Sequence, residues 1–123
     1  MEKGAEFTQQ MIVTEKDTAE SLCSGCLPVF GTPALVAFME STATKVLSGL
    51  SDEETSVGTL VNIEHIKASK IGETINCTAR ITEIDRKKYV FYVEATDSNG
   101  EVVGKGTHER FVVNTEKFMS KLK

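Results

Sequence analysis

The chain has no tryptophan, only two prolines and three cysteines in 123 residues. No segment approaches the roughly 20 consecutive apolar residues that a membrane-spanning helix needs, and the N-terminus lacks the basic and apolar blocks of a secretory signal. An odd number of cysteines without an export signal argues against a framework of disulfide bonds. We therefore expect a cytoplasmic protein without a membrane partner.

The charge of the chain is mildly negative, with a formal net charge of −4. Basic residues are scattered, apart from Lys87-Lys88 and the lysines of the C-terminal tail. A nucleic-acid surface needs denser positive charge, so no nucleic-acid partner is expected. The length predicts a single domain over residues 1–123, with a modest core that a partner surface would help to stabilise.

The apolar periodicity changes once along the chain. Phe7 to Thr14 is typical of a strand, a short helical piece is expected around Ala19 to Cys23, and Pro33 to about Leu50 predicts the long helix. The period then becomes two, which predicts strands at Thr59 to Ile66, Glu73 to Ile84, Tyr89 to Thr96 and Val102 to Val113, before a short helix at Lys117 to Leu122. This order predicts an α+β fold, with an antiparallel sheet and the helix on one face. One helix cannot cover a wide sheet, so dimerisation is expected.

The segment from Phe30 to Glu40 combines several features that suit acyl transfer. Thr32 followed by Pro33 predicts a helix start, because threonine can cap free N–H groups and proline fits the first turn. Glu40 ends an apolar run, where a charge is costly without a partner or a function. A helix N-terminus favours negative charge, and a perturbed carboxylate can act on a carbonyl group.

The sequence Cys23-Ser24-Gly25-Cys26 fits a Cys-x-x-Cys spacing. A structural zinc site needs four ligands, and a redox pair of the thioredoxin type opens a helix after a strand. Leu27-Pro28 follows here instead. We interpret the cysteines as small pocket or core residues, and a redox or metal protein remains a weaker alternative.

Three passages resemble the fluoroacetyl-CoA thioesterase-like group of hotdog-fold proteins. They are Phe30-Gly31-Thr32 with Glu40 eight residues after Thr32, Gly58-Thr59 with His65 seven residues after Gly58, and Gly106-Thr107-His108-Glu109-Arg110 followed by Glu116-Lys117-Phe118. The similarity extends over about residues 5–119. It implies the hotdog fold, a long central helix wrapped by a bent antiparallel sheet, in a homodimer or a higher oligomer.

The same resemblance implies hydrolysis of acyl-CoA thioesters, with CoA as part of the substrate and with neither a separate cofactor nor a metal. It assigns Thr32, Glu40 and His65 to catalysis. It places Gly58 at the substrate, and we expect Phe30, Gly31 and Arg110 to bind the substrate as well. The stretch before Phe30 lacks the phenylalanines that cover the acyl pocket of the fluoroacetyl-specific member.

The residue types fit this chemistry, which needs a nucleophile or activated water, a proton donor for the thiolate and donors for the oxyanion. Glu40 can act as base or nucleophile, His65 can transfer a proton, and Thr32 can offer its hydroxyl and N–H. Eight residues of helix separate Thr32 from Glu40 by roughly 12 Å, too far for both to touch one carbon. We therefore expect a site shared by two subunits, with Thr32 from one and with Glu40 and His65 from the other.

Each of these residues also has an ordinary structural interpretation. Thr32 can be only a helix cap, Glu40 can be solvated or paired with Lys45, and His65 can be a core residue. Arg110 can hold a CoA phosphate, organise the dimer, or serve only in cross-strand pairing, as can His108 on the same face of its strand. A non-catalytic hotdog module that binds an acyl-CoA or another small ligand is the alternative to the enzyme.

Overall fold

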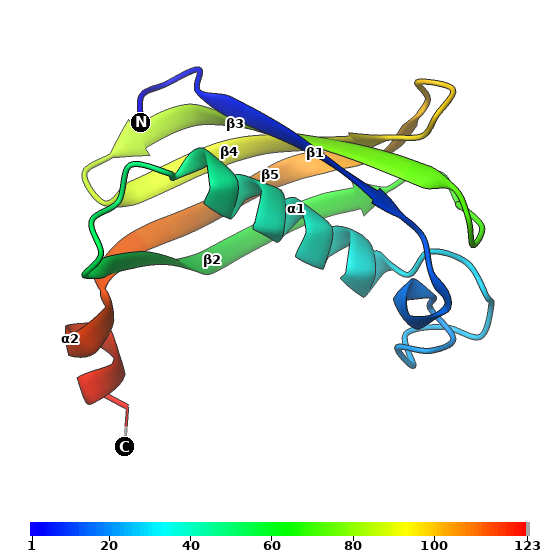
Figure 1. Cartoon of the computed structure of the whole chain (residues 1–123), viewed down its shortest axis with the longest axis horizontal. Helices are drawn as coiled ribbons and strands as arrows, with labels where there is room; N and C mark the ends of the chain where they lie inside the picture. The colour runs from blue at the N-terminus through cyan, green and yellow to red at the C-terminus, as the bar shows by residue number, and fades with distance from the viewer. Residues whose placement is uncertain (123) are drawn as a thin grey trace.

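The computed structural model describes residues 1–122. Five antiparallel strands form one sheet in the order β1-β3-β4-β5-β2, and the long helix α1 (Thr32–Val46) lies across one face of it (Figure 1). The strands are β1 (Glu6–Ile12), β2 (Glu54–His65), β3 (Thr74–Asp85), β4 (Lys88–Thr96) and β5 (Val102–Asn114). A 3-10 helix, η1 (Glu15–Asp17), follows β1, and a short helix, α2 (Thr115–Ser120), follows β5. The expected α+β arrangement is confirmed.

The helical segments differ from the sequence prediction at their ends. Helix α1 has Gly31 as its N-cap and Thr32 as its first residue, so Thr32 is not the cap. The helix ends at Val46 rather than near Leu50, because Leu47 already leaves helical geometry (φ −84°, ψ 51°). Helix α2 begins at residue 115 because the Asn114 side chain accepts a hydrogen bond from the Lys117 N–H.

The short helical piece lies earlier than expected. It was predicted around residues 19–23, but the structure forms it as η1 directly after Thr14. The backbone N–H and the hydroxyl of Thr14 both donate to the Asp17 carboxylate at 2.8 Å, which closes a capping box around η1. Residues 19–23 form turns instead.

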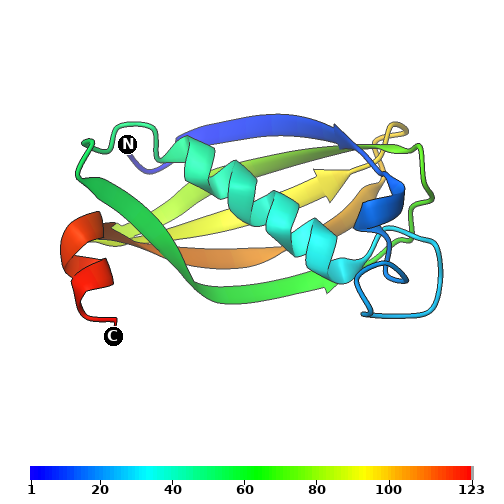
Figure 2. The same ribbon diagram turned by 60° about the horizontal axis from the view of Figure 1, so that its bottom comes forward.

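The core lies between α1 and the concave face of the sheet (Figure 2). The helix buries Leu35, Met39, Ala43 and Val46 at the three- and four-residue spacing of one helical face. Alternate residues of the central strands meet them, including Ile75, Cys77, Ala79, Ile81, Phe91, Val93 and Ala95. No helix within residues 1–122 is long and apolar enough to cross a membrane.

Strand β2 is an edge of the sheet and runs antiparallel to α1 (Figures 1 and 2). Its last residue, His65, therefore lies near the start of α1, and Gly58 lies farther along the helix, beside Glu40. A β-bulge between Gly58 and Leu60 shifts the register of β2 against β5 by one residue. This antiparallel alignment creates two separate groups of the predicted site residues.

Candidate active site

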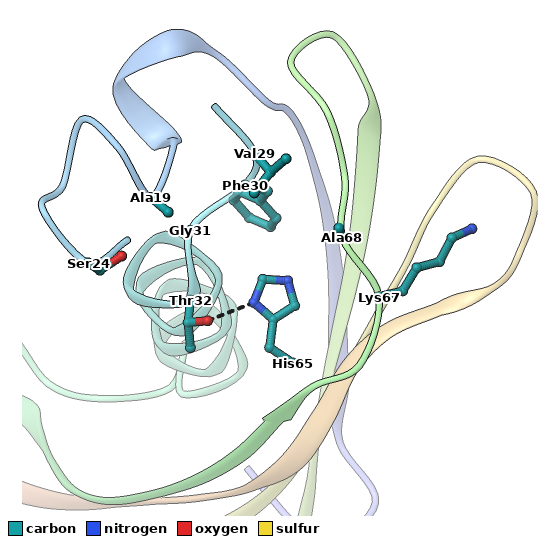
Figure 3. Close-up of a pocket in the computed structure, with 9 residues that line it drawn as sticks. All are labelled: Ala19, Ser24, Val29, Phe30, Gly31, Thr32, His65, Lys67 and Ala68. Atoms are coloured by element: carbon teal, nitrogen blue, oxygen red, sulfur yellow. Dashed lines mark hydrogen bonds between the residues drawn. The ribbon is translucent and has the colours of Figure 1, made fainter. Parts of the chain in front are cut away.

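The first group lies at the N-terminus of α1 and centres on a bond between two predicted residues. Oγ1 of Thr32 lies 2.8 Å from Nδ1 of His65 (Figure 3). Thr32 is exposed in the first turn of α1, so its hydroxyl is free to reach across to β2. The Phe30 ring packs edge-on against the imidazole, with ring centroids 6.1 Å apart. Helix and strand thus hold a hydroxyl against an imidazole nitrogen.

A pocket of about 240 Å³ opens beside this pair (Figure 3). Four predicted residues line it together with five others, in the set Phe30, Gly31, Thr32, His65, Ala19, Ser24, Val29, Lys67 and Ala68. Gly31 is required for close packing here, because a Cβ at this position would lie 2.9 Å from the backbone nitrogen of Ala19. The N–H of Gly31 also donates to the Asp17 carbonyl at 2.9 Å, which fixes the loop that forms the pocket wall.

The environment of His65 favours its neutral form. Burial lowers the pKa of the imidazole below its ordinary value, and the nearby Lys67 backbone partly opposes this effect. Nε2 of His65 is buried and has no hydrogen-bond partner among residues 1–122. Nδ1 is therefore the ring nitrogen that can exchange a proton with Thr32 and with the pocket.

The second group lies farther along α1 and centres on Glu40. Oε2 of Glu40 is 3.7 Å from Nη1 of Arg110, and the Glu40 side chain is 39% exposed. Arg110 is buried and donates from Nε to Ser56 Oγ at 2.8 Å and from Nη2 to the Ser56 carbonyl at 3.1 Å. Gly58 lies against both charges, because a Cβ there would be 3.0 Å from Glu40 Oε2 and 3.2 Å from Arg110 Nη1. Glu40 thus presents a paired carboxylate at the surface.

These two groups correct the expectation that Thr32 comes from one subunit and His65, with Glu40, from the other. Thr32 pairs with His65 of its own chain, so these two residues do not come from different subunits. Glu40 contacts Arg110, neither His65 nor Lys45, whose ammonium donates to Gln9 instead. The physical reason is the antiparallel course of β2, which brings His65 to the start of α1 and not to its middle.

Sequence reasoning missed part of the second group and misplaced two cysteines. Ser56 was not identified, and His108 was given only a structural pairing role. For His108, the sequence signal was the alternation along β5, which places His108 and Arg110 on the buried face of that strand. Cys23 and Cys26 are exposed on the loop before α1, so they are not core residues, whereas Cys77 is buried. Within residues 1–122, no three histidine, cysteine, aspartate or glutamate side chains cluster as metal ligands.

Comparisons with solved structures define the class of the fold. A hot-dog-like protein from Thermanaerovibrio acidaminovorans matches 98% of this chain and 89% of its own, with a TM-score of 0.88 at 21% identity. A crystal structure of a point mutant of the fluoroacetyl-CoA-specific thioesterase FlK, in complex with fluoroacetate and CoA, matches 96% of this chain and 99% of its own. Its TM-score is 0.90 at 30% identity. The fold is a hotdog fold, as the sequence predicted.

Sequence comparisons then give the family. The model of the family described as "FlK: Fluoroacetyl-CoA-specific thioesterase" matches residues 13–116. The fluoroacetyl-CoA thioesterase of Streptantibioticus cattleyicolor is 30% identical over 130 aligned positions, which cover 100% of this chain and 93% of that protein. The chain belongs to the fluoroacetyl-CoA-specific thioesterase family.

Proposed function

We propose that this protein is an acyl-CoA thioesterase that hydrolyses a small acyl-CoA to the free acid and CoA. The observation that carries the proposal is the 2.8 Å contact between Thr32 Oγ1 and His65 Nδ1 at the mouth of a pocket. A hydroxyl paired with a neutral imidazole is a recurring arrangement for acyl transfer. Family membership supports the same chemistry, because the 30% identical relative is a fluoroacetyl-CoA thioesterase.

Thr32 and His65 carry the first step of the proposed reaction. Thr32 Oγ1 attacks the thioester carbonyl carbon while its proton passes to His65 Nδ1. The C–S bond then breaks, and His65 returns the proton to the departing sulfur, which leaves as CoA. Pro33 has no N–H, so the N–H groups of Thr32 and Ala34, in the first turn of α1, are the nearby donors for the oxyanion.

Glu40 carries the second step, in which water releases the acyl group from Thr32. Its carboxylate accepts a proton from water as the hydroxide attacks the acyl carbon, and Glu40 then returns this proton to the Thr32 oxygen as the C–O bond to Thr32 breaks. The rise of about 12 Å along α1 separates Glu40 from the Thr32 of its own chain. We therefore assign each reaction centre to a homodimer, with Thr32 and His65 from one subunit and Glu40 from the other.

The edge strand β2 supports this dimer. It is twelve residues long, and no strand among residues 1–122 pairs with its outer side. Two adjacent apolar residues at its centre, Leu60 and Val61, are 43% and 45% exposed. An unprotected edge with exposed apolar side chains is suited to pairing with a second copy. Glu40 lies beside this strand, because a Cβ at Gly58 of β2 would be 3.0 Å from its carboxylate, so a second copy paired there would lie close to Glu40.

The size of the pocket supports a small acyl group. Its volume of about 240 Å³ is below the usual range of drug-sized sites, and small residues, Ala19, Ser24 and Ala68, form much of its wall. Lys67 also lines it, but its ammonium is held by Asp97 at 2.6 Å. We therefore expect turnover to fall as the acyl chain lengthens.

The test measures release of free CoA from acyl-CoA substrates of increasing chain length. Short substrates should be hydrolysed, and Glu40→Gln and His65→Ala should each lose most turnover while the fold is retained. Glu64→Gln provides a matched control, because Glu64 precedes His65 on the exposed face of β2. Acyl-CoA binding without CoA release would instead make the protein a binding module, and full activity in either variant would remove that residue from the mechanism.

A further inference from the structure

His108 is a second histidine, and the proposed reaction does not use it. It lies on β5, is 1% exposed, and stacks on Phe91 with ring centroids 6.1 Å apart. Nδ1 of His108 lies 2.8 Å from the Leu60 carbonyl, and Nε2 lies 3.1 Å from Arg110 Nη1. Both ring nitrogens are therefore engaged, and neither faces the pocket at Thr32.

These two contacts define the tautomer of His108. A carbonyl oxygen can only accept a hydrogen bond, so Nδ1 must carry the proton and donate it to Leu60. Nε2 then has a lone pair and accepts a hydrogen bond from Arg110. Burial, and next the Arg110 charge, lower the pKa of His108, although the Leu60 bond and nearby carboxylates oppose this. The ring thus stays neutral and can accept from Arg110.

Arg110 is held on three sides. Ser56 accepts from Nε through its hydroxyl and from Nη2 through its carbonyl, and His108 accepts from Nη1. Guanidinium groups are planar, so these three bonds fix the orientation of the whole group. The fourth neighbour is Glu40, whose carboxylate lies 3.7 Å from the same Nη1. Glu40 is the exposed end of a network whose His108 and Arg110 members are buried.

The β-bulge gives this network its geometry. The extra residue in β2 follows Gly58, so the strand departs from regular pairing where the Leu60 carbonyl meets His108. A Cβ at Gly58 would lie 3.3 Å from His108 Cε1, as well as against Glu40 and Arg110. The bulge and the glycine together leave space for the imidazole, the guanidinium and the carboxylate at one point.

We infer that His108 is a positioning residue, which fixes Arg110 through Nε2 so that Arg110 holds the Glu40 carboxylate in its reactive orientation. This inference rests on the proposed function, because it assumes that Glu40 takes part in catalysis. A small misplacement of a reacting group can reduce turnover by about a hundredfold. The loss should appear in kcat rather than in KM, because His108 acts on Glu40 through Arg110 and does not touch the substrate.

Two substitutions separate the bonds that His108 makes. In His108→Asn, the shorter amide can still donate to the Leu60 carbonyl but cannot reach Arg110. In His108→Gln, the longer amide can offer its oxygen to Arg110. We expect His108→Asn to lower kcat by about a hundredfold with little change in KM, and His108→Gln to recover about tenfold of that loss. Equal losses in both variants would overturn the inference.

A matched control separates positioning from general destabilisation. Val93→Ala removes buried volume from β4 without touching the network. His108→Asn should lose far more turnover than Val93→Ala at a similar loss of thermal stability. Proportional losses of turnover and stability in the two variants would reduce His108 to a packing role.

A double-mutant cycle distinguishes this inference from the proposed function. If His108 acts through Glu40, His108→Asn should cause no further loss of kcat in a Glu40→Gln background. Additive losses would overturn the positioning role and leave the catalytic role of Glu40 intact. Full activity of Glu40→Gln alone would contradict the proposed function itself and, with it, the inference.

Discussion

The hydroxyl of Thr32 and the Nδ1 atom of His65 lie 2.8 Å apart, although the two residues are 33 positions apart in sequence. One belongs to the first turn of α1 and the other to the last position of β2. The N-cap of α1 is Gly31, so Thr32 does not cap the helix, and its hydroxyl pairs with the imidazole instead. This relationship is the one that the proposed role of Thr32 as nucleophile requires.

The first prediction concerns the Thr32 hydroxyl. Thr32→Ser keeps an oxygen within reach of His65 and should retain substantial turnover. Thr32→Ala removes it and should lower kcat by about a hundredfold or more, because the nucleophile is lost. Steady-state CoA release measures both. Equal losses in the two variants would show that the hydroxyl is not used.

The second prediction concerns the pH dependence of catalysis. The proposed reaction needs neutral His65, and burial lowers the pKa of this imidazole below the ordinary value of 6.5. A lower pKa keeps the imidazole neutral to lower pH, so the acidic limb of the kcat/KM profile should lie below 6.5. Protonation of His65 observed by NMR should follow the same limb. A limb above 6.5 would contradict the assigned role.

The third prediction concerns Gly31. Gly31→Ala would place a Cβ 2.9 Å from the Ala19 nitrogen, so the loop that forms the pocket wall must move. Turnover should fall while the circular dichroism spectrum stays unchanged. Gly49→Ala is the matched control, because its Cβ would meet only Met1 at 3.5 Å or more. Unchanged kcat and KM in Gly31→Ala would show that this loop contact is dispensable.

The fourth prediction concerns the three thiols. Cys23 and Cys26 are exposed, whereas Cys77 is buried and burial raises its pKa to about 11. A thiol reagent at mildly alkaline pH should therefore modify two cysteines in the native protein and the third only after unfolding. Cys77→Ala should leave the native count unchanged. Absence of reaction at Cys23 and Cys26 would instead favour the redox or metal alternative.

The fifth prediction concerns the outer edge of β2. Val61→Lys introduces a charge at this edge and should prevent a second copy from pairing there. Light scattering should show a monomer, and CoA release should fall because each proposed centre takes residues from two subunits. Ile84→Lys is the control, since Ile84 is a partly exposed apolar residue of β3, away from this edge. An active Val61→Lys monomer would contradict the shared site.

The sequence was sufficient to locate the long helix and the strands, but it did not show how they are aligned relative to one another in the fold. Period-two alternation located four strands, although β2 begins at Glu54 and not at Thr59, and the Thr32-Pro33 pair located the start of α1 to within one residue. No local pattern shows that β2 runs antiparallel to α1, so the partnership of Thr32 with His65 became visible only in three dimensions. The Glu40–Arg110 contact was missed for the same reason, because Lys45 is close in sequence and Arg110 is not. The bulge after Gly58 also has no sequence signature beyond a glycine.

The spacing of Thr32 and Glu40 on one helix has a further consequence for mixed assemblies. In the proposed dimer, pairing a subunit that carries Thr32→Ala with one that carries Glu40→Gln puts both substitutions in the same centre and leaves the other centre intact. A hybrid of the two would bring the intact threonine of one chain to the intact glutamate of the other. Two inactive preparations, unfolded together and refolded, should therefore complement each other and regain hydrolysis that neither has alone.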